Sequence, residues 1–240
     1  MTTHAASAGL CLAAVAVLTL SGCGMMAHGQ NSEGVTLYQQ GYYQKALESF
    51  QQAVASDPNN ADAYYNIAAT YHQLSKVDSQ HGYAEQAESY YNLALDHAPD
   101  HVDCHRGLAV LLVEQGSSDK AYRLLERWSE RSPSLSEPHV ELARLYEEFG
   151  DSENARQQLL AAIEIEPTSP RALTALGQLN EKEGNYAQAL ANYQRSLWHD
   201  SMQPDVQARV AALQSARPAG APTAGTAPTR TVNTPPPVTR

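Results

Sequence analysis

The strongest constraint on the fold of this 240-residue chain is a pattern that recurs about every 34 residues. Its clearest copy runs from Ser136 to Ser169, with apolar residues at helical spacing on both sides of Gly150. Gly150 breaks the first helix, and Pro167 stops the second because its ring cannot continue the hydrogen-bond ladder. Two helices joined by so short a turn pack antiparallel. One such pair cannot bury both of its apolar faces, so neighbouring copies have to stack on it.

The residues of this copy predict how its two helices meet. Ala143 and Ala155 are expected to face each other, because a larger side chain would hold the helices apart. The first apolar stripe consists of Leu142, Leu145, Tyr146 and Phe149, and the second of Leu159, Leu160, Ala162, Ile163 and Ile165.

The same register extends in both directions. It gives copies at about 27–60, 61–101, 102–135, 136–169 and 170–203. The second copy is seven residues too long, with the excess around Ser75 to Gly82, between its helices. Trp128 of the third copy stands where a small Ala is usual, so local packing must open to admit an indole. Residues 204–215, which begin with Pro204, predict a last helix that covers the final apolar face.

The recurring residues Leu142, Ala143, Tyr146, Gly150, Ala155, Leu159, Ala162 and Pro167 resemble the tetratricopeptide repeat (TPR). This resemblance implies an all-α, right-handed superhelical solenoid of about five helix pairs plus the C-terminal capping helix, spanning residues 31–215. The first helix is expected to begin at Asn31 or Ser32, as its N-cap. The work implied by the family is the binding of other proteins.

In this family the first helices of successive copies line a concave groove. The resemblance therefore implies contact positions for a protein or peptide partner at Asn31, Tyr65, Asn66, Arg106, Val140, Glu141, Arg144, Thr174 and Gln178, with Val35, Ala69 and Val110 beside them. Their mixture of Tyr, Asn, Arg and Gln suits hydrogen bonding to an extended peptide or a helix. The Lys and Asn pattern with which some family members bind chaperone C-termini is not matched by Asn31 and Val35.

The N-terminus predicts a membrane anchor. Residues 10–20 form an apolar run that is too short to span a bilayer and fits a signal-peptide core. It ends in Leu20-Ser21-Gly22-Cys23, which resembles the lipobox of bacterial lipoproteins. This implies a signal peptide over 1–22, a lipidated Cys23 and a short linker over 23–30. Gly24 after the cysteine implies the periplasmic face of the outer membrane, by the sorting rule of enteric bacteria.

The charge of the chain argues against one class of partner. Residues 24–215 carry all 26 acidic residues and 13 of the 16 basic ones, a net charge of −13, which disfavours binding to nucleic acid. The last residues, 216–240, contain six Pro, three Arg and almost nothing to bury, and predict a disordered Pro/Ala/Thr-rich tail.

No motif for phosphate binding, zinc proteolysis or a nucleophilic serine is present, so we expect neither an enzyme nor a cofactor or small-molecule substrate. The leading interpretation is a membrane-anchored lipoprotein scaffold in the bacterial cell envelope. One alternative is a pilotin-like assembly factor for a pilus or secretion complex. Another is a metal-binding or cofactor-delivery protein that uses the cluster from His97 to His105, although His105 also fits a packed position.

Overall fold

The computed structural model describes residues 26–78 and 81–215, and every regular element within these ranges is an α-helix. Helical residues 26–39 come first. They are followed by α2 (Tyr43–Ser56), α3 (Ala61–Val77), α4 (Tyr83–His97), α5 (Val102–Glu114), α6 (Ser118–Arg131), α7 (Glu137–Glu148), α8 (Ser152–Ile165), α9 (Pro170–Lys182), α10 (Tyr186–His199) and α11 (Pro204–Ser215).

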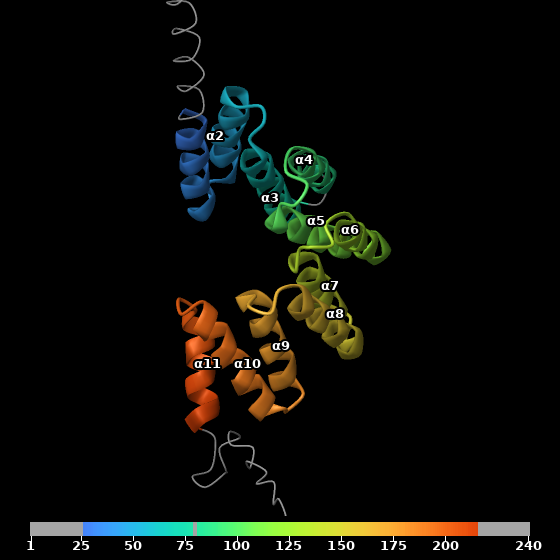
Figure 1. Ribbon diagram of the computed structural model, residues 1–240. Helices are drawn as coiled ribbons and strands as arrows, with labels where there is room; N and C mark the ends of the chain where they lie inside the picture. The colour runs from blue at the N-terminus through green and yellow to red at the C-terminus, as the bar shows by residue number, and fades with distance from the viewer. Residues whose placement is uncertain (1–25, 79–80, 216–240) are drawn as a thin grey trace, which may run out of the picture.

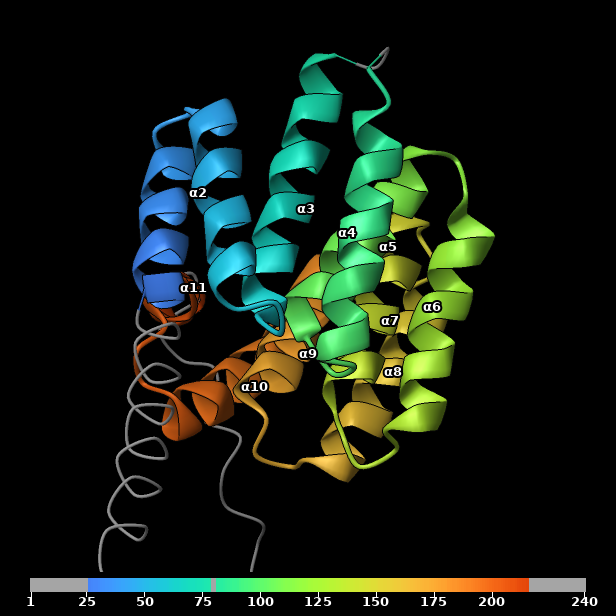
Figure 2. The same ribbon diagram turned by 90° about the horizontal axis from the view of Figure 1, so that it is seen from above.

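The helices stack in chain order into a curved solenoid (Figure 1). Consecutive helices pair as the sequence predicted: α3 with α4, α5 with α6, α7 with α8 and α9 with α10. Both views place α4 and α6 on the outer side of the curve and α3 and α5 nearer its inner side (Figures 1 and 2). The all-α solenoid of TPR type is therefore confirmed.

Glycines make the turns within the helix pairs. Gly41, Gly116, Gly150 and Gly184 have φ between +71° and +81°, a left-handed conformation that other residues rarely adopt. Three of the joints between pairs are closed by side-chain caps. The side chains of Asn60, His101 and Ser169 each accept a hydrogen bond from a backbone N–H in the first turn of the following helix.

The core repeats with the sequence register. Ala143 and Ala155 are buried in one cluster, as predicted. Phe149 and Leu160 are about half exposed, however, at 50% and 52%, so their assignment to the apolar stripes is wrong. Phe149 caps α7, where the chain is already leaving the helix. Leu160 lies one residue past the buried Leu159, and this rotation of about 100° turns it away from the core.

Three boundary predictions have clear outcomes. Residues 26–30 are already helical, so they extend the first repeat rather than form a linker, and Asn31 lies inside the helix instead of capping it. In the second copy, α3 is lengthened to 17 residues, and α4 begins at Tyr83. Helix α11 packs Val206 against Ala189 and Tyr193, which confirms the capping helix. The signal peptide, Cys23 and the tail lie outside the described residues.

Candidate functional site

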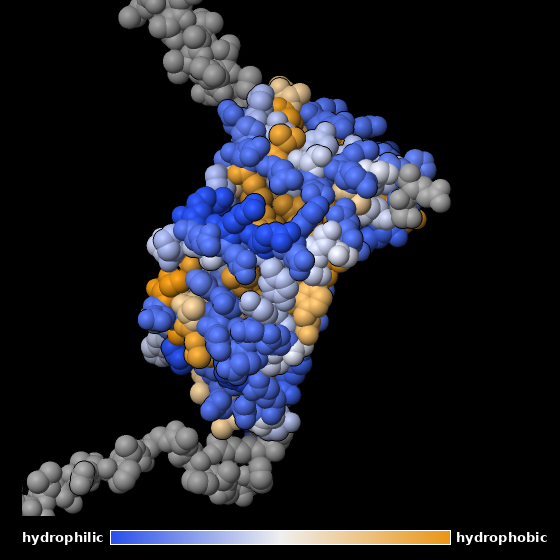
Figure 3. Space-filling view, turned by 90° about the vertical axis from the view of Figure 1, so that its right-hand side faces the viewer, coloured by the Kyte–Doolittle hydropathy of each residue, from blue (hydrophilic) through white to orange (hydrophobic). Residues whose placement is uncertain are grey.

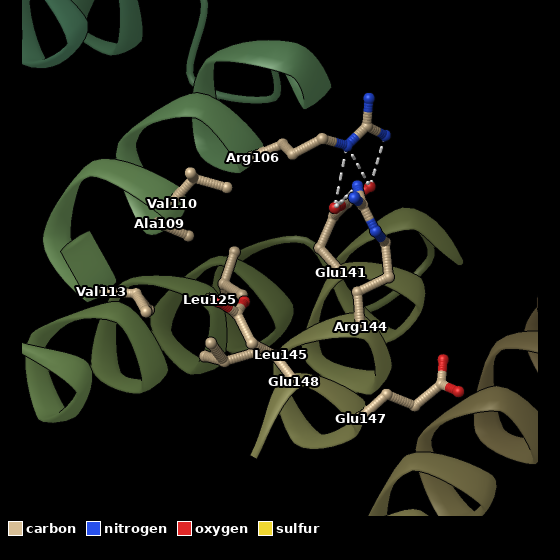
Figure 4. A pocket seen from close by; sticks show the side chains of 10 residues that line it. All are labelled: Arg106, Ala109, Val110, Val113, Leu125, Glu141, Arg144, Leu145, Glu147 and Glu148. Carbon is tan, nitrogen blue, oxygen red and sulfur yellow. Dashed lines mark hydrogen bonds and ion pairs between the residues drawn. The ribbon is translucent and has the colours of Figure 1, made fainter. Parts of the chain in front are cut away.

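The first helices of three successive repeats border a continuous hollow. One part, of about 300 Å³, is lined from α5 and α7 by Arg106, Ala109, Val110, Val113, Glu141, Arg144, Leu145, Glu147 and Glu148, with Leu125 of α6 below (Figure 4). A second part, of about 330 Å³, is lined by Arg106, Val140, Arg144, Glu147, Arg171, Thr174, Ala175 and Gln178. The two parts share Arg106, Arg144 and Glu147, so they form one surface across α5, α7 and α9.

A buried carboxylate holds this surface together. The side chain of Glu141 is 3% exposed, and three arginines from three helices contact it. Arg106 Nε donates to both carboxylate oxygens, at 3.1 and 3.0 Å. Arg171 Nη2 lies 2.8 Å from Oε1 and Arg144 Nη1 lies 3.3 Å from Oε2. Glu141 therefore links α5, α7 and α9 as much as it lines the hollow.

The charges of the hollow are nearly balanced. Burial of the Arg106 guanidinium opposes its charge, but the hydrogen bonds and negative charge of Glu141 outweigh this effect and raise the Arg106 pKa. Burial raises the pKa of the Glu147 carboxyl above its usual value, while Lys182 and Arg144 partly oppose the rise. Arg144 and Arg171 remain 51% and 43% exposed, so part of each guanidinium is open to a ligand.

The structure brings together the predicted contact residues of the third, fourth and fifth copies. Arg106, Val140, Glu141, Arg144, Thr174 and Gln178 all line the hollow. Val140 and Glu141 are only 4% exposed, however, so their side chains offer little surface. The Thr174 hydroxyl is committed to Ser196 and Gln203. Contact with a partner at these positions stays a prediction.

The predicted residues of the first two copies lie elsewhere. Asn66 donates to the side-chain oxygen of Asn31 at 2.9 Å, which joins the first repeat to the second. The ring centroids of Tyr65 and His101 lie 5.0 Å apart, and burial raises the pKa of the Tyr65 hydroxyl. None of these three lines the two parts of the hollow.

Sequence reasoning missed Arg171. It lies three residues before Thr174, one helical turn away on the same face of α9, and it reaches back to Glu141. This helical spacing is the signal that places it on the groove side.

The residues proposed as a metal cluster make packing, capping and hydrogen-bond contacts within the fold. His97 stacks on Tyr64, with ring centroids 5.1 Å apart. His101 Nδ1 accepts from the backbone N–H of Cys104, as the cap of α5. The Cys104 thiol donates to the carbonyl oxygen of Tyr91, and burial raises its pKa to about 12. Within residues 26–78 and 81–215, no three His, Cys, Asp or Glu side chains converge as metal ligands. The geometry thus gives the metal-binding alternative no support.

His105 occupies a packed position, as one interpretation of the sequence predicted. Its ring is 2% exposed and stacks on Trp128 at 4.0 Å. Its Nε2 lies 2.9 Å from the carbonyl oxygen of Pro99. Burial lowers the His105 pKa to about 4, so the ring is neutral and Nε2–H is the donor. The indole N–H of Trp128 donates to Asp100 at 2.9 Å, which seats this large side chain beneath the outer surface.

Comparison with known families agrees with this architecture. Residues 34–75 match the family described as "TPR repeat", and residues 80–139 and 140–205 match "Tetratricopeptide repeat". The chain belongs to the tetratricopeptide repeat family. Proteins of this family provide surfaces for other proteins, so a role in protein–protein interaction follows at this general level. In the described part of this TPR chain, no helix is long and apolar enough to cross a membrane.

Similar proteins show how widely the repeat is used. The structure of the Thermus thermophilus TPR protein TTC0263 is 24% identical, with a TM-score of 0.58, and the match covers 79% of this chain and 99% of that one. The structure of pilF from Pseudomonas aeruginosa is 18% identical, with a TM-score of 0.52, over 81% and 85% of the two chains. Both show the fold.

The curated relatives are much longer proteins than this chain. The BBSome complex member BBS4 homolog of Drosophila melanogaster is 26% identical over 67% of this chain. The human protein O-mannosyl-transferase TMTC1 is 26% identical over 68% of this chain. The matched region spans 34% of the former and 18% of the latter, so the likeness concerns the repeats.

Proposed function

We propose that this chain is a non-enzymatic scaffold of the bacterial cell envelope that holds a segment of a partner protein in the hollow over α5, α7 and α9. The observation that carries the proposal is the hollow itself, in which the apolar residues Val110 and Val113 lie beside the partly exposed guanidinium of Arg144. Apolar surface suits a partner's side chain, and the open N–H donors suit its carbonyl or carboxylate oxygens.

Photo-crosslinking tests where the partner binds. A photoreactive amino acid replaces Val110 in the hollow or, as the control, Gln157, which is exposed on α8. We expect a discrete adduct from position 110 in living cells and none of that mass from position 157. Arg144→Gln should reduce the adduct, and Arg195→Gln on α10, which removes the same charge, should leave it unchanged. Equal adducts at both positions, or no response to Arg144→Gln, would argue against the hollow as the binding surface.

The lipid anchor is the second part of the proposal. Its support is the apolar run of residues 10–20 ending at Cys23, because acyl chains on that thiol would hold the protein by burying CH₂ groups. Helix begins by residue 26, only three residues later, so at about 3.5 Å per residue the solenoid would sit within roughly 10 Å of the anchor.

Fractionation tests the anchor separately. Cys23→Ser should release the protein from washed membranes, whereas Cys104→Ser, a change at a buried thiol, should leave it membrane-bound. Retention of the Cys23→Ser chain in the membrane fraction would refute lipidation without touching the assignment of the hollow. A pilotin-like role stays a prediction, and identification of the crosslinked partner decides it.

A further inference from the structure

A second groove lies on the outer side of the solenoid, between α4 and α6. It has a volume of about 380 Å³, and its α4 wall is formed by Glu88, Asn92 and Leu95. Its floor and α6 wall consist of His105, Leu108, Leu112, Lys120, Arg123, Leu124, Arg127, Trp128 and Arg131. The concave hollow shares none of these residues, so the two surfaces are distinct.

Trp128 explains why this groove forms. The residues at its place in the register of the other four repeats are Ala53, Ala94, Ala162 and Ser196, all small. The indole is fully buried and stacked on His105, so it fills space between α5 and α6 where other repeats need only a methyl or hydroxymethyl group. The α5–α6 pair also packs less closely than α3–α4, α7–α8 or α9–α10. The indole thus holds α5 and α6 farther apart than the helices of those three pairs.

Helix α6 lines the groove with basic residues. Lys120, Arg123, Arg127 and Arg131 are all exposed and lie three and four residues apart, so they share one face. The same four register positions hold Asn154, Gln157, Ala161 and Ile165 in α8, and Gln86, Ser89, Leu93 and His97 in α4. In α2 and α10 a single Lys or Arg stands there, Lys45 and Arg195 respectively. The repeat fold therefore does not require this stripe.

Most of the stripe's positive charge has no ion-pair partner, although Glu88 of the α4 wall also lines the groove. Arg131 pairs with Asp100 at 3.3 Å. Lys120, Arg123 and Arg127 have no ion pair within 4 Å among the described residues, although Asp119, Glu126 and Glu130 occupy the adjoining face of α6. Figure 3 looks onto this outer side and shows strongly hydrophilic side chains gathered beside a hydrophobic recess at the level of α4 and α6.

We infer that the α4–α6 groove binds an acidic, amphipathic segment of a partner protein. Carboxylates pair with the basic stripe while apolar side chains contact Leu95 and Leu124. Lys120 and Arg131 are eleven residues apart, about 17 Å along a helix, which matches three turns of a partner helix. The chain's own last 25 residues contain three Arg and no acidic residue, so their charge does not fit. An anionic bilayer fits poorly too, because an extended anionic surface would also face the acidic residues of the rest of the solenoid, whereas a short segment meets mainly the stripe.

Fluorescence anisotropy provides the test. The probe is a labelled helical peptide of about 12 residues with Leu on one face and Glu on the other, and its partner probe has Gln in place of Glu. The full chain should bind the Glu peptide more tightly than the Gln peptide, and added salt should weaken this binding. Arg123→Gln combined with Arg127→Gln should reduce the affinity for the Glu peptide about 3- to 10-fold.

A matched variant separates the groove from overall charge. Lys45→Gln combined with Arg195→Gln also removes two positive charges, from the corresponding stripe positions of α2 and α10. This variant should change the affinity by less than about twofold. In a Trp198→Phe chain, Trp128 is the only tryptophan, and its fluorescence should respond to the Glu peptide. Both results would support the groove, and helical circular dichroism should stay unchanged in each variant.

Three outcomes would overturn the inference. The first is equal affinity for the two peptides, which includes no detectable binding of either. The second is an equal loss of affinity in both charge variants, which would indicate a nonspecific effect of net charge. The third is co-sedimentation with phosphatidylglycerol vesicles that Arg123→Gln with Arg127→Gln abolishes and the Glu peptide does not compete, which would assign the stripe to a membrane surface. Because α6 variants leave Arg144 and Val110 intact, none of these outcomes bears on the concave hollow.

Discussion

Replacing Glu141 with Gln removes the negative charge at the centre of three arginines while keeping the shape of the side chain. The contact with Arg106 should dominate, because that guanidinium is 29% exposed and bonds both carboxylate oxygens. Charge-assisted hydrogen bonds of this kind contribute about 1.5–3 kcal/mol. Arg144 and Arg171 are 51% and 43% exposed, so each should add about 0.2–1 kcal/mol.

The net effect is smaller than the sum of the contacts. Glutamine is cheaper to bury than a carboxylate, which offsets part of the loss, and the half-exposed arginines can be hydrated once they are released. We expect Glu141→Gln to lower the free energy of unfolding by about 2–3 kcal/mol. Urea unfolding followed by circular dichroism measures this change. Hydrogen exchange should rise together in α5, α7 and α9, because the carboxylate links all three.

Double-mutant cycles decide whether the geometry has been interpreted correctly. Pairing Glu141→Gln with Arg106→Met, Arg144→Met or Arg171→Met keeps most of each arginine stem and isolates the charged contact. The coupling energy with Arg106 should be the largest and that with Arg144 the smallest. Glu148→Gln, an exposed change on the same helix, should cost less than about 0.5 kcal/mol. A larger coupling with Arg144 than with Arg106, or a stabilised Glu141→Gln protein, would contradict the assignment of Arg106 as the main partner of Glu141.

Two further predictions concern packing and pH. A Cβ at Gly177 would lie 2.5 Å from a Tyr193 ring atom. Gly177→Ala should therefore destabilise the protein by about 1–2 kcal/mol, yet stabilise a Tyr193→Leu background by up to about 1 kcal/mol, as urea titrations of the four proteins would show. The His105 pKa is lowered to about 4 by burial, so the unfolded chain binds a proton first as the pH falls. Stability should decline from about pH 6.5 to pH 4 by roughly 3 kcal/mol more than in His105→Phe, and parallel pH–stability curves for the two would contradict this.

The repeat architecture could be predicted because its determinants recur. Gly150 and its counterparts in other copies are followed by a helix at a fixed distance, so several copies support one register. Single features were harder to predict. The first helix begins by residue 26 because Ala27 is buried and Gln30 bonds to Ser56, and both contacts lie within a single, weakly patterned copy.

The candidate site was only partly predictable, for a different reason. The family register gives the groove side of each first helix, and Arg106 and Arg144, which it places there, line one hollow in the structure. It carries no information about which side chains meet across copies. The pairing of Arg171 with Glu141 spans thirty residues and depends on the angle between repeats. Glu141 was therefore expected at a contact surface, and the structure shows that it lines the hollow while its carboxylate lies in a buried ion-pair network.

The sequence contains both features of the outer groove, but it does not show that they lie together. Trp128 in place of Ala predicts locally open packing, and the structure shows a hollow beside the indole. The basic residues of α6 are visible at helical spacing, but they sit on a second helix, which the family places away from the concave groove. Only the folded chain puts the open packing and the charge in one place.

Helix α6 contributes to both surfaces, through adjacent residues that point in different directions. Leu124 lines the outer groove and Leu125 lines the concave hollow. Leu125 is 1% exposed and Trp128 is fully buried, so these two side chains anchor α6, and the binding of one ligand should not shift the other surface. We therefore expect the Glu peptide to change the yield of the Val110 adduct by less than about twofold, as two independent sites require. A larger change in either direction would mean that α6 moves, and that the two sites are coupled through it.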